Sequence, residues 1–203
     1  MNQYKERVAS VDIDAYIAGL GDLVATRVGN GFEPYMLSFM FRSHFDDLNR
    51  LGAMRHEIER VYSRFLTECH RNPNSDNNTH NKPILIGCPD WPVFKRRKAD
   101  RVKADLPGEG AHWGAILLVP PYHRLKHGIV DHFTGAKRSA YIRSDTFLTR
   151  IHVEHVTYSI RQSVAYTLKS LQRRRCGIDD ILVLPRARSE MTRHRGTNRG
   201  AVY

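Results

Sequence analysis

The sequence has few cysteines and no long apolar run. Its 203 residues include only Cys69, Cys88 and Cys176, which lie far apart and form no Cys-x-x-Cys pair. An odd, scattered set argues against a disulfide framework or a zinc knuckle, so we expect reduced thiols in a cytoplasmic protein. No apolar run approaches the roughly 20 residues that a membrane-spanning helix needs. The first residues also lack the apolar segment of a signal peptide, so we expect no membrane partner.

Acidic residues are scarce relative to basic ones. The chain has 21 Asp and Glu against 32 Lys and Arg, which gives a net charge of +11 and a pI of about 9.9. This excess indicates a polyanionic partner, most simply a nucleic acid, and the alternative is a basic surface without function. Hydrophobic residues make up 41% of the chain, which is enough for a folded core in one domain of ordinary size.

Hydrophobic periodicity divides the chain into helices and strands. The expected helices span residues 11–27, 43–70, 122–133 and 159–175. The expected strands, rich in β-branched and aromatic residues, span 35–41, 83–87, 111–119, 146–156 and 181–184. After the first helix this order resembles βαββαβ. It predicts an α+β domain with an antiparallel sheet of about four to five strands and helices packed on it.

Composition divides the chain into three parts. We expect an N-terminal helical segment over 1–34, the main domain over 35–184, and a basic tail over 185–203 that is poor in apolar residues. Within the main domain, two basic clusters are candidates for contacts with nucleic-acid phosphates. They are Lys95, Arg96, Arg97 and Lys98 in a segment broken by prolines, and Arg173, Arg174 and Arg175 at the end of the last helix. For the first cluster, a solvated helix face is the alternative.

A histidine and a Tyr-x-x-Lys motif are the candidates for chemistry. His112 begins an apolar strand, and the helix over 159–175 carries Tyr166 and Lys169 three positions apart. A free tyrosine has a pKa near about 10, so at neutral pH it needs help to act as a nucleophile. A nearby ammonium favours the phenolate and stabilises charge that develops on a phosphate. These residues therefore suggest tyrosine chemistry on a phosphodiester.

The element order and these motifs resemble the HUH endonuclease superfamily of rolling-circle replication initiators, relaxases and phage replication proteins. In that family one strand carries His-hydrophobic-His as metal ligands, and a later helix carries the nucleophilic tyrosine, often as Tyr-x-x-Lys. The resemblance covers about residues 35–184. It implies single-stranded or hairpin DNA as the partner, Mg²⁺ or Mn²⁺ as the cofactor, and nicking by Tyr166, assisted by Lys169, through a phosphotyrosine. The expected role is replication initiation for a phage, plasmid or other mobile element.

The metal strand departs from the family pattern. The second histidine of the pattern is replaced by Gly114, so the chain has His-Trp-Gly. His112 could still hold a divalent ion with a carboxylate and water, or with His152 or His155 from the neighbouring strand, because Mg²⁺ and Mn²⁺ accept few protein ligands. Our site prediction takes His112 and His152 as ligands. The other interpretation is a metal site that has decayed.

The tyrosine helix departs from the pattern as well. Its apolar stripe of Ile160, Val164, Leu168 and Leu171 lies nearly opposite Tyr166 and Lys169. If the stripe faces the sheet, Tyr166 does not point directly at a metal on the sheet. It could still reach a site at the edge of the helix, or the helix could pack differently. The alternative is a surface tyrosine on a basic helix.

Two other functions remain open. The same fold without cleavage would be a DNA-binding regulator or accessory protein of a mobile element. An RNA-binding module would stack bases on aromatic residues of the sheet. The candidates for stacking are Phe39, Phe41 and Trp113.

Overall fold

The strands form one antiparallel sheet. The computed structural model describes residues 12–42, 50–74, 80–90 and 112–186. Within them, five strands pair in the order β4-β1-β3-β2-β5, and every pair is antiparallel. The strands are β1 (Glu33–Phe41), β2 (Ile84–Asp90), β3 (His112–Val119), β4 (Leu148–His155) and β5 (Leu182–Leu184). The predicted α+β fold with an antiparallel sheet is therefore confirmed.

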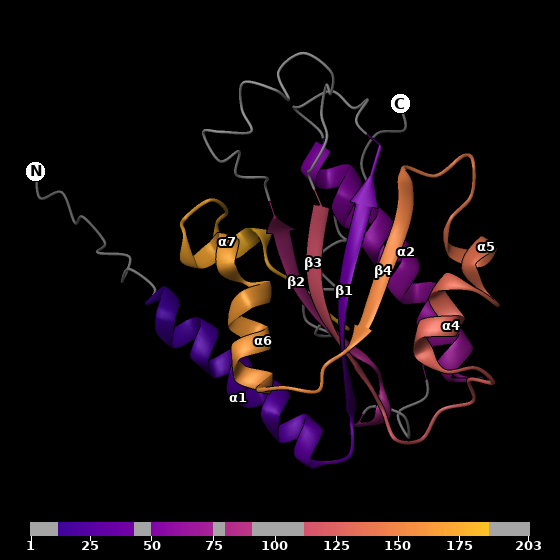
Figure 1. The fold of residues 1–203 in the computed structure, drawn as a ribbon, viewed down its shortest axis with the longest axis horizontal. Helices are drawn as coiled ribbons and strands as arrows, with labels where there is room; N and C mark the ends of the chain where they lie inside the picture. The colour runs from indigo at the N-terminus through magenta and orange to yellow at the C-terminus, as the bar shows by residue number, and fades with distance from the viewer. Residues whose placement is uncertain (1–11, 43–49, 75–79, 91–111, 187–203) are drawn as a thin grey trace, which may run out of the picture.

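Helices cover both faces of this sheet (Figure 1). They are α1 (Ile13–Gly29), α2 (Arg50–Cys69), α4 (Ile129–Thr134), α5 (Arg138–Tyr141), α6 (Ile160–Thr167), α7 (Lys169–Gln172) and the 3-10 helix η2 (Ile178–Asp180). Figure 1 shows α2 behind the strands, with α6 and α7 in front of them. The chain order β1-α2-β2-β3-α4-β4 and the spatial order 4-1-3-2 together form a split β-α-β topology.

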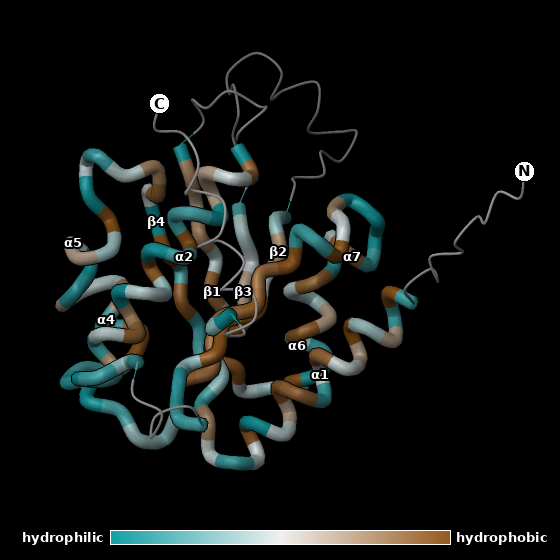
Figure 2. The backbone as a smooth tube through the Cα atoms, turned by 180° about the vertical axis from the view of Figure 1, so that it is seen from behind, coloured by the Kyte–Doolittle hydropathy of each residue, from teal (hydrophilic) through white to brown (hydrophobic). Residues whose placement is uncertain are grey.

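Alternation along the strands divides the buried residues into two cores. On the face that packs against α2 and α4, Phe39 and Trp113 meet Met54, Phe65 and other helix residues. On the opposite face, residues such as Ile116 and Leu118 meet α1, α6 and α7. Figure 2 shows hydrophobic residues gathered along the central strands, while the turns at the margins are hydrophilic. No helix in the described ranges combines the length and apolarity needed to cross a membrane.

The first helix belongs to the second core. Asp12 caps α1, because its side chain accepts hydrogen bonds from the backbone N–H groups of Asp14 and Ala15. Ile17 and Val24 are buried together with residues of α6 and α7. The exposed ion pair of Arg161 with Asp22 also joins α6 to α1. The segment N-terminal to the sheet thus packs against the helix that carries Tyr166.

Two predicted helices are shorter in the structure. The segment 122–133 is helical only from Ile129, which follows Gly128 as the N-cap. The helix predicted over 159–175 is interrupted at Leu168, and α7 ends at Gln172. The carbonyl of Thr167 accepts a hydrogen bond from the thiol of Cys88 on β2, with a donor–acceptor distance of 3.3 Å. This contact with the sheet explains the interruption, because it engages a carbonyl that would otherwise bond an amide one turn later. The predicted start of α2 at residue 43 lies outside the described residues.

Two of the three aromatic residues proposed for stacking on bases are fully buried. Phe39 and Trp113 are both 0% exposed in the core beneath α2. Phe41 packs against Phe147 with ring centroids 5.2 Å apart. The RNA-binding alternative therefore loses Phe39 and Trp113, because odd-numbered residues of β1 and β3 face the side of the sheet that packs against α2 and α4.

Candidate functional site

The site begins with a pair of strand residues, Asp90 and His112. They are directly opposite each other in the β2–β3 ladder, at the end of β2 and the start of β3. The sequence predicted that the first of these strands ends at Gly87, but it continues through Pro89. β5 pairs only with Leu85–Gly87, so Pro89 lies where β2 has become an edge of the sheet, a position that tolerates proline. This extension brings Asp90 beside His112.

Three side chains bind the carboxylate of Asp90. Its Oδ2 lies 3.0 Å from Nε2 of His112 and 2.6 Å from Nζ of Lys169. Its Oδ1 accepts a hydrogen bond of 3.0 Å from the hydroxyl of Ser170. Burial alone would raise the pKa of Asp90, but the hydrogen bonds from His112, Lys169 and Ser170 outweigh it and hold that pKa well below its ordinary value. Asp90 is therefore an anion fixed between two potential cations.

Lys169 connects this carboxylate to Tyr166. Its Nζ lies 4.4 Å from the centroid of the Tyr166 ring, which is a cation–π contact. Burial alone would lower the pKa of Lys169, but its hydrogen bond to Asp90 and the charge of that carboxylate raise it. The ammonium is therefore present at neutral pH. We call the five residues of this arrangement the His112 cluster: Asp90, His112, Tyr166, Lys169 and Ser170.

Tyr166 lies on the exposed side of α6, away from the buried stripe, as its spacing predicted. Val164, Leu168 and Leu171 are buried against the sheet, while Tyr166 is 58% exposed. It does not point into the sheet, yet the contact with Lys169 keeps it beside the cluster. The two residues singled out by sequence, His112 and Tyr166, are therefore joined through Asp90 and Lys169.

Gly114, at the position of the missing second histidine, lies under the interruption between α6 and α7. A Cβ at Gly114 would be 3.8 Å from the carbonyl oxygen of Thr167 and 3.9 Å from its Cγ2. A methyl group would thus touch Thr167, and a longer side chain would have to pass it. Gly114 and its neighbour Cys88 let the helix approach the sheet at this point. A side chain as long as the histidine of the HUH pattern would therefore meet Thr167 at this position.

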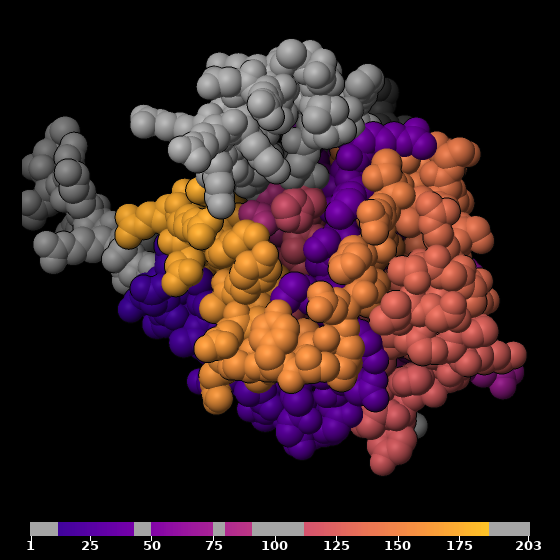
Figure 3. All heavy atoms as spheres, viewed as in Figure 1, coloured from indigo at the N-terminus to yellow at the C-terminus, as the bar shows by residue number. Residues whose placement is uncertain are grey.

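Beside α6 the sheet face is open. Residues paired across an antiparallel sheet lie on the same face. The pairings therefore place Arg150 and Met40 in one row with His112, and His152 and Ser38 in one row with Gly114. Figure 3 shows this region as a recess between α6–α7 and β4, with β1 and β3 at its base. We call it the open strip: Ser38, Met40, Arg150, His152 and Glu154.

The predicted metal ligands face the same side but do not converge. His152 is exposed on β4, and β1 separates that strand from β3, which carries His112. His155 faces the opposite side, where its ring lies 5.0 Å from that of Tyr35. The alternative prediction that His155 joins His112 as a metal ligand is therefore wrong. Across the described ranges, no three His, Cys, Asp or Glu side chains form a group that could hold a metal ion.

The donor set itself does not fit the divalent metal centre that the resemblance implies. His112 and Asp90 supply one imidazole nitrogen and one carboxylate. The same carboxylate oxygen already binds the ammonium of Lys169 at 2.6 Å, and a second cation at that oxygen would be repelled.

Of the two basic clusters predicted to contact nucleic acid, the structure describes only one. Lys95, Arg96, Arg97 and Lys98 lie outside the described residues. Arg173, Arg174 and Arg175 are exposed directly after α7. Arg174 has a φ of 53°, the left-handed conformation that usually suits glycine. The three arginines therefore follow the turn that carries Lys169, on the same short connection.

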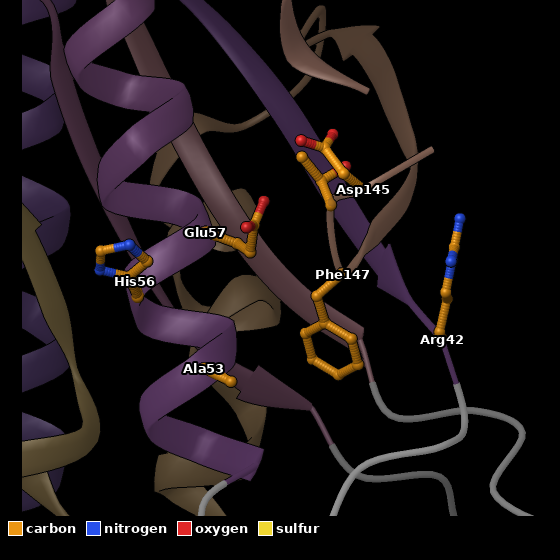
Figure 4. Close-up of a pocket in the computed structure, with 7 residues that line it drawn as sticks. Arg42, Ala53, His56, Glu57, Asp145 and Phe147 are labelled. Carbon is orange, nitrogen blue, oxygen red and sulfur yellow. The ribbon is translucent and has the colours of Figure 1, made fainter. Parts of the chain in front are cut away.

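A pocket of about 440 Å³ lies on the other face of the sheet, between α2 and the segment before β4 (Figure 4). Its charged groups are already engaged within the fold. Glu57 pairs with Arg60 at 2.8 Å, and Asp145 pairs with Arg143 at 3.1 Å. Arg42 donates to the carbonyl of Ser144. We assign this pocket no role.

Sequence reasoning missed Asp90 and Ser170. Asp90 follows Pro89 in a segment that the sequence suggested was irregular, and only the pairing of β2 with β3 places it opposite His112. The available signal was its position next to a basic segment and at the end of an apolar strand. Ser170 adjoins Lys169 in sequence, but its role depends on the turn that brings it to Asp90.

Comparison with known proteins adds no assignment. No family model matches the chain, and neither a curated protein nor a solved structure does so. The resemblance to HUH endonucleases therefore rests on the motifs and element order alone.

Proposed function

We propose that this protein binds single-stranded or hairpin DNA along the open strip and nicks it with Tyr166. The observation that carries this proposal is the chain of contacts from Tyr166 through Lys169 and Asp90 to His112. It combines an exposed phenol, an ammonium and an imidazole at one edge of a basic protein. The proposed setting is replication initiation of a phage, plasmid or mobile element in the cytoplasm.

The proposed reaction is a transesterification. The Tyr166 oxygen attacks the phosphorus, a new O–P bond forms, and the bond from phosphorus to the 3′-oxygen breaks. The phenolic proton is transferred overall to the leaving 3′-oxygen, so the products are a phosphotyrosine and a free 3′-hydroxyl. The ammonium of Lys169 supports the step, because it favours negative charge on the phenol and on the phosphate.

The surface around the cluster supports binding of a polyanion. Arg150 and His152 are exposed on the open strip, and Arg173, Arg174 and Arg175 are exposed beyond α7. Together with the net charge of +11, these side chains favour a phosphate backbone that crosses the cluster. Binding through such contacts weakens steeply as salt rises.

The test is formation of a covalent adduct. The protein is incubated with labelled single-stranded and hairpin oligonucleotides, in Mn²⁺ and separately in EDTA, and run on a denaturing gel. We expect a shifted band that Tyr166→Phe abolishes, because this substitution removes only the hydroxyl. Tyr158→Phe is the matched control, since Tyr158 is 55% exposed just before α6, and it should keep the band.

An adduct that persists in Tyr166→Phe would assign the nucleophile to another residue. The absence of any adduct, together with tight salt-sensitive DNA binding, would favour the second candidate, a DNA-binding regulator that does not cut. One observation favours that candidate: Gly114 replaces the second histidine and is covered by Thr167. The adduct assay and the binding measurement together separate the two functions.

A further inference from the structure

The carboxylate of Asp90 has the surroundings of an anion that already binds its cation. Its side chain is only 8% exposed, and its Oδ2 is shared by His112 and Lys169. The shorter contact is the one to Lys169, at 2.6 Å. A buried carboxylate with an imidazole beside it is a common half of a divalent metal site. Here the remaining position next to the carboxylate oxygen is filled by an ammonium from α7.

We propose that Lys169 Nζ takes the place of a divalent cation at the Asp90–His112 pair, so that the cluster carries its own cation and does not bind a metal ion. A single positive charge at this point balances Asp90. It also remains accessible, because the Lys169 side chain is 25% exposed. The catalytic consequence rests on the proposed function: the ammonium, next to the Tyr166 ring, meets the scissile phosphate.

The position of Lys169 is determined by the packing of its turn against the sheet. The next residue, Ser170, is buried and bonds the other oxygen of the same carboxylate. Leu168 and Leu171 are both 0% exposed and hold this turn on the sheet. Lys169 and Ser170, which are neighbours in α7, therefore both bind Asp90, and this holds the ammonium at the carboxylate.

The first test measures melting temperature in EDTA and in Mn²⁺. We expect the same value for the wild-type protein in both, because its cation position is filled. Lys169→Glu replaces the ammonium by a carboxylate and turns Asp90 and His112 into part of a three-donor set. This variant should melt lower in EDTA and gain roughly 5 °C or more in Mn²⁺. Adding His112→Ala should remove the gain, and Lys169→Gln, with no third donor charge, should gain far less.

A rise in the wild-type melting temperature with Mn²⁺, lost in His112→Ala, would overturn the proposal. So would a Lys169→Glu protein that folds but shows no gain in Mn²⁺. If Lys169→Glu does not fold, the wild-type and His112→Ala melting temperatures still decide whether the Asp90–His112 pair binds Mn²⁺.

The second test separates this inference from the proposed function. If Lys169 supplies the cation, the adduct on oligonucleotides should form in EDTA at a rate within about twofold of that in Mn²⁺. An adduct in Mn²⁺ but not in EDTA overturns the inference and leaves Tyr166 as nucleophile. No adduct in either buffer contradicts the proposed function, and the melting temperatures then decide the inference alone.

Discussion

Asp90 and Lys169 form an ion pair whose oxygen and nitrogen atoms are 2.6 Å apart, and it joins the end of β2 to the first residue of α7. The same lysine lies over the ring of Tyr166, and the same carboxylate holds His112. One buried anion thus places a tyrosine, an ammonium and an imidazole that come from three different elements.

Removing the charge of Asp90 should destabilise the protein. Asp90→Asn keeps an acceptor oxygen but leaves Lys169 without its counter-ion, and we expect a loss of about 2–3 kcal/mol in the free energy of unfolding at pH 7. The folded-state pKa of Asp90 is lowered, so its contribution is complete above about pH 4 and disappears as pH falls through the folded value. Urea unfolding at pH 7 and at pH 3 should show the difference from wild type shrinking at the lower pH.

Asp22→Asn is the matched control for this prediction. Asp22 pairs with Arg161 at 2.8 Å, but both side chains are about two thirds exposed, at 65% and 67%. Water screens such a pair, so we expect a loss below about 1 kcal/mol. Equal losses in the two variants would show that Asp90 is an ordinary surface partner.

Two glycines should respond to alanine in opposite ways. A Cβ at Gly87 would lie 2.7 Å from the Cβ of Ala115 and closer still to the carbonyl oxygen of Gly114. Gly87→Ala should therefore cost about 1–3 kcal/mol through overpacking. Gly19 lies inside α1 with no atom within 4 Å of the added carbon, so Gly19→Ala should stabilise by about 0.5–1 kcal/mol. Thermal unfolding of both variants checks the signs, and a stabilising Gly87→Ala would contradict the close approach of β2 to β3.

Stability should fall as the solution becomes acidic, because two histidines are held neutral. Burial lowers the pKa of His132, whose Nε2 lies 2.7 Å from the hydroxyl of buried Tyr141, and burial also lowers that of His70. The unfolded chain therefore takes up protons that the folded chain excludes, and stability is complete above about pH 6.5 and declines below it. Melting temperatures from pH 8 to pH 5 measure the decline.

The matched substitutions for this pH dependence are His132→Gln and His56→Gln. The glutamine at 132 keeps a polar group near Tyr141 but does not titrate, so the slope below pH 6.5 should become smaller, with a remainder from His70. His56 is exposed on α2, and its replacement should leave the dependence of melting temperature on pH unchanged. An unchanged slope in His132→Gln would remove that residue as the cause.

Replacing Arg174, just after α7, by glycine should raise the stability of the fold and lower its affinity for DNA. Arg174 has a φ of 53°, which costs an L-residue about 1 kcal/mol, so Arg174→Gly should raise the free energy of unfolding by about that amount. The same change removes one cation, and the salt dependence of single-stranded DNA binding should lose about 0.7 in log–log slope. Arg173→Gly removes the same charge at a φ of −86°, so it should weaken binding without stabilising the fold. Unchanged DNA affinity in both variants would exclude these arginines from the interface.

Much of the fold could be predicted from local patterns. The stripe of Val164, Leu168 and Leu171 predicted which side of the Tyr166 helix is buried, and the apolar run over 111–119 predicted the strand that the structure has from His112 to Val119. Helical periodicity could not reveal the interruption at Leu168, because it results from the contact between Cys88 and Thr167 across the fold. The burial of Phe39 and Trp113, which the sequence offered as candidates for stacking on bases, could not be foreseen for a similar reason: only the packed helices show which side of a strand is covered.

The sequence by itself determined the antiparallel α+β class, the basic charge and the adjacency of Tyr166 and Lys169, because helical and strand periods and charge are local properties. Only the tertiary structure decided what those residues touch. Asp90 meets His112 through the register of two strands, and it meets Lys169 because β2, β3 and α7 converge at one end of the sheet. The register and the packing of α7 are set by contacts between residues far apart in the chain. For that physical reason, the residue that holds the candidate site together was visible only in the folded molecule.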